Sequence, residues 1–158
     1  MKKLLSALLL TASLAAMPSL VFATDYKLGP IEIGQPWSRA TPSTAPSAGG
    51  FLTLTNKGDL PDRLIAIESP AAKQTQLHEM KMDGAVMRMR ELENGVPLAP
   101  GQTVEMKPGG NHVMFIGLKA PFVKDQKVSA TLVFEKAGRI DVDFQVDALG
   151  ATQPTIHP

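Results

Sequence analysis

Residues 128–146 read VSATLVFEKAGRIDVDFQV, and this stretch decides the fold class. Apolar side chains recur at every second position on both sides of a central turn: Val128, Ala130, Leu132 and Phe134, then Ile140, Val142, Phe144 and Val146. Such alternation is typical of β-strands that bury one face. Ala137-Gly138 lies between the two runs and predicts the turn of a hairpin.

The preceding sequence repeats this pattern of short strands and turns. Glycine and proline occupy nearly every gap between the candidate strands, and we find no convincing amphipathic helix. The further strands are expected at residues 26–33, 50–55, 63–68, 74–82, 85–92, 102–107 and 112–118. Seven to nine short strands at this spacing predict a single all-β domain, a β-sandwich or small barrel with Greek-key connections.

The N-terminus predicts export. Lys2 and Lys3 precede an apolar stretch that ends near Phe22, and Ala23 closes a cleavage site of small residues. We expect a signal peptide at 1–23, a β-domain at 24–149 and a flexible tail at 150–158, which makes the protein periplasmic. An uncleaved membrane anchor is the alternative, but the stretch is short for a span and Pro18 interrupts it.

Composition excludes several classes of function. Without the signal peptide the chain has 14 basic and 15 acidic residues, so no basic surface favours nucleic acid. The sequence contains no cysteine, which argues against a lipid anchor and against a blue-copper centre. It has neither a Gly-x-Ser-x-Gly turn nor a phosphate-binding glycine loop, and we expect no enzymatic activity.

Four methionines gather in residues 77–90, LHEMKMDGAVMRMR. Asp83-Gly84 predicts a two-residue type I′ turn, which would place His78 opposite Met89, Met80 opposite Met87, and Glu79 opposite Arg88. The two-residue period of a strand then places one group of side chains on a single face, namely His78, Met80, Met82, Met87 and Met89. A three-residue turn would move Met89 to the other face.

A second short segment, residues 111–114, reads NHVM. In a strand His112 and Met114 share a face, while Val113 points into the core. If this strand lies beside the hairpin, two imidazoles and two thioethers meet, and thioether sulfur is a soft ligand that favours Cu(I) over Zn(II). Taken singly, such methionines more often fill a core and such histidines more often lie on the surface. His157, in the tail, is a weak candidate for an extra ligand.

Other polar and aromatic residues have structural interpretations. Trp37 is expected to pack, with Arg39 binding a carbonyl or carboxylate. The acid pairs Asp141/Asp143 and Glu91/Glu93 are expected to lie on solvated strand faces, because no histidine accompanies them.

The spacing of these candidate ligands resembles a known family. His78-x-Met80, Met89 after ten intervening residues, and His112-x-Met114 are similar to the signature of the periplasmic PCu(A)C copper chaperones. Segments 37–42, 51–56, 98–101 and 107–110 resemble the family as well. One departure is visible, because the interval between Met89 and His112 is one residue longer than in the family pattern.

The resemblance implies a cupredoxin-like β-sandwich that binds one Cu(I) per chain through His78, Met89, His112 and Met114, with Met80 as the alternate ligand. It also implies a monomer that delivers copper towards the CuA centre of cytochrome c oxidase, directly or with a Sco-type thiol protein. Two rivals remain open: a copper-buffering or protein-binding module whose methionine face is an apolar patch, and a copper redox enzyme.

Overall fold

The computed structural model describes residues 26–155, so the predicted signal peptide and His157 lie outside the described residues. The described chain is all-β, as the alternation predicts, and no helix within it is long and apolar enough to cross a membrane. Its strands are β1 (Tyr26–Leu28), β2 (Ile31–Arg39), β3 (Ser47–Asn56), β4 (Asp62–Glu68), β5 (Ala72–Asp83), β6 (Val86–Glu91), β7 (Val96–Leu98), β8 (Thr103–Met106), β9 (His112–Leu118), β10 (Lys127–Phe134) and β11 (Arg139–Asp147).

The strands join edge to edge in the order β6-β5-β9-β3-β2-β11-β10-β4-β7, with β1 paired to β2 and β8 paired to β3. The β2–β11 pair is parallel and the other pairs of this path are antiparallel. One buried apolar cluster draws side chains from β2 through β5 and from β7 through β11. The strands therefore fold over one shared hydrophobic core.

The hairpin that decided the fold class forms as expected. Val128 pairs with Phe144 and Ala130 pairs with Val142, and all four side chains are buried. Gly138, in the turn, has a φ of 103°, a value that glycine adopts without a steric cost. The period-2 pattern was sufficient here because one face of this hairpin covers the core.

Three boundaries differ from the predicted strands. The segment 26–33 divides at Gly29 into β1 and β2. The predicted strand ends at residue 33, but β2 continues to Arg39 through a bulge at residues 34–36, where the register shifts and Gln35 has a φ of 47°. Strand β7 was not predicted; it is short and contains Pro97, which an edge strand tolerates because one side of it needs no ladder hydrogen bonds.

Trp37 and Arg39 have the structural roles predicted for them. The Trp37 side chain is buried, and its ring centroid lies 4.7 Å from that of Phe51. Arg39 Nε donates to the carbonyl oxygen of Ala151 at 2.6 Å. This bond ties residues 150–155, the described part of the predicted flexible tail, to the end of β2.

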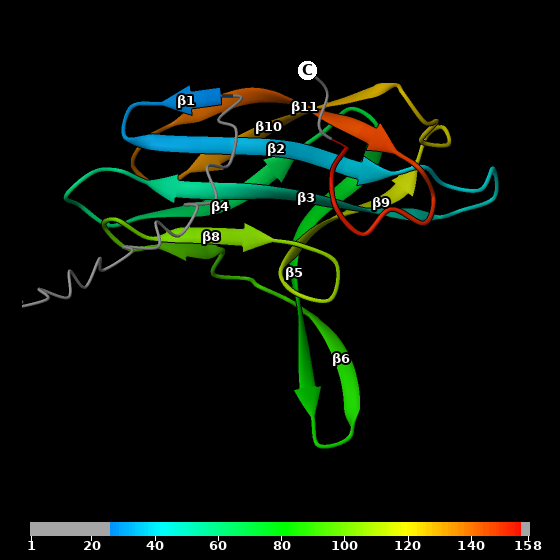
Figure 1. The fold of residues 1–158 in the computed structure, drawn as a ribbon, viewed down its shortest axis with the longest axis horizontal. Helices are drawn as coiled ribbons and strands as arrows, with labels where there is room; N and C mark the ends of the chain where they lie inside the picture. The colour runs from blue at the N-terminus through cyan, green and yellow to red at the C-terminus, as the bar shows by residue number, and fades with distance from the viewer. Residues whose placement is uncertain (1–25, 156–158) are drawn as a thin grey trace, which may run out of the picture.

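Strand β5 carries the central feature of the fold for function. It lies between β6 and β9, and its first half is part of the main sheet. Its second half leaves the body of the molecule together with β6, so the β5–β6 hairpin projects as an arm (Figure 1). Every residue of β6 is exposed. The strand lies at one end of the strand order, with β5 as its paired neighbour.

Candidate metal centre

Two histidines from distant parts of the sequence meet at the base of the projecting hairpin. His78 of β5 pairs directly with His112 of β9, and their ring centroids lie 5.7 Å apart in an edge-on arrangement with an interplanar angle of 69°. The neighbouring pair, Leu77 and Val113, points the other way into the core. The alternation of the strands therefore directs both imidazoles to the same outer face.

Both histidine side chains are largely shielded from solvent. His78 is 8% exposed and His112 is 7% exposed. Burial lowers the pKa of His78, and the charge of nearby His112 lowers it further, against a smaller opposing effect of Glu91. The lowered pKa favours the neutral form of the His78 ring, which is the form that can donate a lone pair to a metal.

Met114 lies beside this pair. It follows His112 by two residues on β9, shares its face, and pairs with Gln76 across the β5–β9 ladder. The side chain is half-buried. The expectation that His112 and Met114 share a face is confirmed, as is the burial of Val113 between them.

The register of the hairpin was predicted wrongly. Asp83 pairs with Val86, so the two loop residues are Gly84 and Ala85 instead of Asp83 and Gly84. Gly84 has a φ of 62°, whereas Ala85 does not have a positive φ. This is the pattern of a type II′ turn, which requires glycine at its first central position, whereas a type I′ turn needs positive φ at both.

The corrected register changes which residues lie opposite one another. Met80 faces Met89, Met82 faces Met87, and His78 faces Glu91. Because the shift is two residues and the side-chain period is also two, the predicted common face of the histidine and the methionines is preserved. Met89 is a diagonal neighbour of His78, at the roughly 7–8 Å over which long side chains still make contact.

The opposite face of the hairpin is corrected in the same way. Glu79 pairs with Arg90, to which it is bound by an ion pair, and not with Arg88. Arg88 instead forms an ion pair with Asp83 at 2.7 Å. The arginine and aspartate side chains are largely exposed, so each pair contributes at most about 1 kcal/mol.

Hydrogen bonds occupy one nitrogen of each imidazole. His112 Nδ1 donates to the carbonyl oxygen of Gly110 at 3.0 Å. His78 Nε2 lies 2.8 Å from Gln76 Oε1, and Gln76 Nε2 donates to Glu91 Oε2 at 2.9 Å. His78 Nδ1 is buried without a hydrogen-bond partner. An unpartnered buried nitrogen is costly, and a ligand at this position would remove the cost.

Gln76 and Glu91 were missed as site residues by sequence reasoning. Glu91 was expected to lie with Glu93 on a solvated face, and it is exposed, but it also bonds Gln76 beside His78. The period of β5 places Gln76 on the His78 face, which was a usable signal. The proximity of Glu91 depends on the hairpin register.

The donors on this face suit a soft metal ion. Among residues 26–155, no three histidine, cysteine or carboxylate side chains gather where they could hold a metal together. The imidazole pair is accompanied on its own face by Met80, Met89 and Met114. Nitrogen and thioether donors with no thiolate or carboxylate cluster match the preferences of Cu(I) and not those of Mg(II) or Ca(II).

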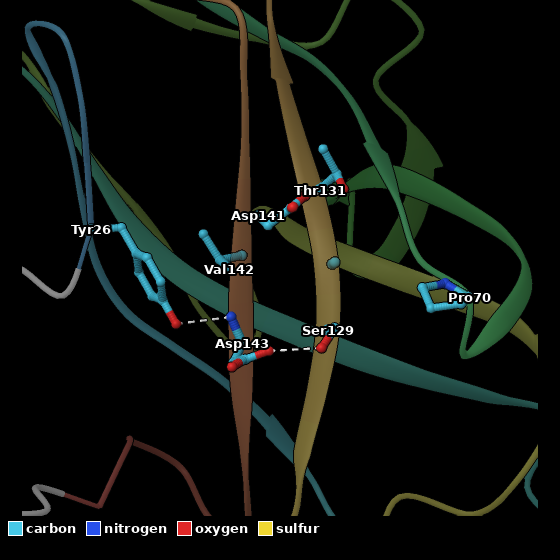
Figure 2. A pocket seen from close by; sticks show the side chains of 8 residues that line it. Tyr26, Pro70, Ser129, Thr131, Asp141, Val142 and Asp143 are labelled. Carbon is cyan, nitrogen blue, oxygen red and sulfur yellow. Dashed lines mark hydrogen bonds between the residues drawn. The ribbon is translucent and has the colours of Figure 1, made fainter.

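A pocket elsewhere on the molecule contains the predicted acid pair Asp141/Asp143 (Figure 2). Ser129 Oγ donates to Asp143 Oδ1 at 2.7 Å, and Thr131 Oγ1 donates to Asp141 Oδ1 at 2.6 Å. The Asp143 backbone N–H donates to the hydroxyl of Tyr26. Each carboxylate is bonded to a hydroxyl of the neighbouring strand and no histidine lines the pocket, which agrees with a solvated sheet face.

Comparison with known proteins gives the relationships of the chain. Residues 31–146 match the family described as "Putative lipoprotein LpqE-like". The chain is 30% identical over 145 residues to "Putative lipoprotein Lxx21020" of Leifsonia xyli subsp. xyli (strain CTCB07), a match that covers 91% of this chain and 86% of that protein.

Solved structures of copper-related domains have the same fold. The copper-bound PCuAC domain from PmoF2 is 32% identical with a TM-score of 0.66, and the match covers 78% of this chain and 97% of that one. The apo PCuAC domain from PmoF1 is 29% identical with a TM-score of 0.67, covering 78% and 98%. CuI-DR1885 from Deinococcus radiodurans is 26% identical with a TM-score of 0.59, covering 72% and 75%.

These likenesses confirm the predicted cupredoxin-like Greek-key β-sandwich and agree with the copper-chaperone resemblance at the level of the domain. The family match spans the strands that carry the histidine pair and the methionine hairpin. The chain belongs to the LpqE-like family, and its structural neighbours are PCuAC copper-binding domains.

Proposed function

We propose that this protein is an exported copper chaperone that binds one Cu(I) through His78, Met89, His112 and Met114 and releases it by ligand exchange. The observation that carries the proposal is the cross-strand pair of His78 and His112, which has a buried, unpartnered nitrogen and thioethers on its own face. The copper-bound and Cu(I) states of similar domains support the choice of metal.

The donor set fits Cu(I) on chemical grounds. Two neutral imidazoles and two thioethers add no charge, so the site would keep the single positive charge of the ion. Methionine binds without losing a proton, and it forms no disulfide in an oxidising compartment. Its remaining hazard there is oxidation to the sulfoxide, which would weaken the site.

Release would begin at the hairpin. Met89 is 47% exposed and lies on β6, an edge strand. Met114 and the histidines are more deeply placed. An incoming thiolate, which binds Cu(I) more strongly than a thioether does, would displace Met89 first and the inner donors afterwards.

The family resemblance suggests the recipient, and the predicted signal peptide suggests the compartment. We propose delivery in the periplasm towards the CuA centre of cytochrome c oxidase, directly or through a Sco-type thiol protein. The predicted signal peptide and a relative named as a lipoprotein support export. A lipid anchor requires a cysteine, which this sequence lacks, so we propose that the protein is free in the periplasm. We also propose that it is a monomer.

The proposal is tested by metal competition. With reductant present, the mature protein should take one Cu(I) from a competing chelator and should bind Zn(II) weakly, and X-ray absorption should show both nitrogen and sulfur around copper. Replacing both Met89 and Met114 by leucine should remove most of the Cu(I) affinity. A preference for Zn(II), or unchanged Cu(I) binding in the double variant, would contradict the proposal.

A second candidate function rests on a separate observation. Met82 and Met87 lie opposite each other near the tip of the hairpin and are 54% and 48% exposed. Exposed apolar side chains on a projecting arm are also suited to protein contact. A copper-buffering or protein-binding module would use this face without delivering the metal.

A further inference from the structure

We propose that Glu91 and Gln76 form a hydrogen-bonded relay that fixes the tautomer of His78, so that His78 offers Nδ1 to copper while His112 offers Nε2. Gln76 and Glu91 are positioning residues in this proposal, because they act through His78 and are not ligands themselves. The inference deepens the proposed copper site and rests on that function for its metal. The proton positions that it assigns belong to the metal-free protein.

The relay begins at Glu91. Its ionised carboxylate has only acceptors to offer. The amide of Gln76 must therefore turn its NH₂ group towards Glu91, and Gln76 Nε2 is indeed 2.9 Å from Glu91 Oε2. The reverse orientation would bring the amide oxygen against the carboxylate, where two acceptors repel each other. Glu91 thus decides that Gln76 Oε1 faces the imidazole.

The second step transfers this orientation to His78. Gln76 Oε1 is an acceptor only, and it lies 2.8 Å from His78 Nε2. His78 Nε2 must therefore carry the hydrogen. In a neutral imidazole the other nitrogen then has the free lone pair. That nitrogen is Nδ1, which is buried without a partner in the described structure.

His112 reaches the complementary state by a different route. Its Nδ1 lies 3.0 Å from the carbonyl oxygen of Gly110, which can only accept a hydrogen bond. The hydrogen is therefore on Nδ1, and the lone pair is on Nε2. The two facing histidines would consequently bind one metal through different ring nitrogens, each fixed by its own outer hydrogen bond.

The register of the hairpin is what brings the relay together. Glu91 lies directly opposite His78, and Gln76 precedes His78 by two residues on the same face of β5. Glu91 is also on the same short strand as Met89. Separation of β6 from β5 would therefore remove a ligand and the group that orients another ligand in one movement. Partners of this kind typically change metal affinity by about 10- to 100-fold when they are removed.

The test reads the tautomer directly. Nitrogen-15 NMR of the imidazole rings in the metal-free protein, at a pH where both rings are neutral, should show His78 protonated at Nε2 and His112 protonated at Nδ1. Addition of Cu(I) should then perturb Nδ1 of His78 and Nε2 of His112. A His78 ring protonated at Nδ1 in the metal-free protein would overturn the proposal.

Two variants test the origin of the tautomer. Glu91→Gln allows the Gln76 amide to turn over, and Gln76→Leu removes it; each should give a mixed His78 tautomer and weaken Cu(I) binding by about 10- to 100-fold. Glu93→Gln is the matched control, because it makes the same change at an exposed glutamate two residues away, and it should alter neither readout. If Glu91→Gln keeps a pure Nε2-protonated His78, the relay is disproved.

The outcome is separable from that of the proposed function. The tautomer of His78 is measured without metal. If the protein binds no Cu(I) but His78 carries its hydrogen on Nε2, and Glu91→Gln abolishes this preference, the relay is supported and the copper function is disproved. If the protein binds Cu(I) tightly and the metal-free His78 is protonated at Nδ1, the copper function is supported and the relay is disproved. Glu91 is exposed on an edge strand, so its glutamine variant should keep the fold.

Discussion

His78 and His112 face each other across the β5–β9 ladder, 34 residues apart in the sequence and 5.7 Å apart between ring centroids. This pairing joins the two sequence segments that carry methionines. It also sets the order of the site: a buried nitrogen pair at the base, Met114 beside it, and Met80 and Met89 one step outwards along the hairpin.

Met80 and Met89 should substitute for each other in part, because they lie directly opposite on the face of His78. Replacing either one by leucine should weaken Cu(I) binding less than replacing both, with a coupling of about 0.5–3 kcal/mol between the two changes. Chelator competition on the two single variants and the double variant measures this. Met106→Leu is the control, because Met106 is buried in the core away from this face. Strictly additive losses would show that the two methionines do not substitute for each other, and an unchanged affinity in Met80→Leu would show that Met80 takes no part.

Gly84→Ala should loosen the hairpin without disturbing the core. Gly84 has a φ of 62° and open space where a Cβ would lie, so the added methyl group costs only backbone strain, about 1–3 kcal/mol. Amide hydrogen exchange in β6 should accelerate, and the Cu(I) affinity should fall because Met89 lies on that strand.

Gly29→Ala is a closely matched control for this change. Gly29 has a φ of 55°, also with open space at the Cβ position, but it lies in the turn between β1 and β2. The same strain there should leave copper binding unaltered. If the two variants have equal effects on Cu(I) affinity, the β5–β6 turn has no special role in holding Met89 at the site.

Met82 and Met87 should be dispensable for binding the first Cu(I), since they lie beyond the Met80–Met89 pair on the projecting hairpin. The double leucine variant should keep the affinity and the 1:1 stoichiometry. The double serine variant should do the same, while removing the exposed apolar surface. Loss of metal-independent binding to a protein partner in the serine variant alone would favour the protein-binding module over the chaperone.

Much of the site could be predicted from the sequence because strand periodicity is a local property. The period of two placed His78 with Met80, and His112 with Met114, before any pairing was known. The assignment of side chains to a face stayed correct although the turn was predicted wrongly, because a shift of two residues leaves every side chain on its face. The choice of donors followed from residue chemistry, which is why a soft-metal site could be proposed without a structure.

The hairpin turn shows where that local information ends. Asp-Gly is a strong signal for a two-residue loop, yet the chain places Gly84 first and Ala85 second in that loop. Both arrangements have glycine at a position of positive φ, so the local sequence permits either. The register of the two strands distinguishes them, because Asp83 pairs with Val86 and leaves Gly84 and Ala85 in the loop.

The sequence by itself determined that this protein is an all-β domain with imidazoles and thioethers on one strand face, because alternation and ligand chemistry need no distant contact. Only the tertiary structure decided that His78 lies between His112 and Glu91, that Met89 lies opposite Met80, and that Gln76 reaches the imidazole. The pairing of His78 with His112 joins distant segments, and burial of Leu77 and Val113 in the core accompanies it. The pairings of Met80 and Glu91 belong to the exposed β5–β6 hairpin, whose register the local sequence leaves open.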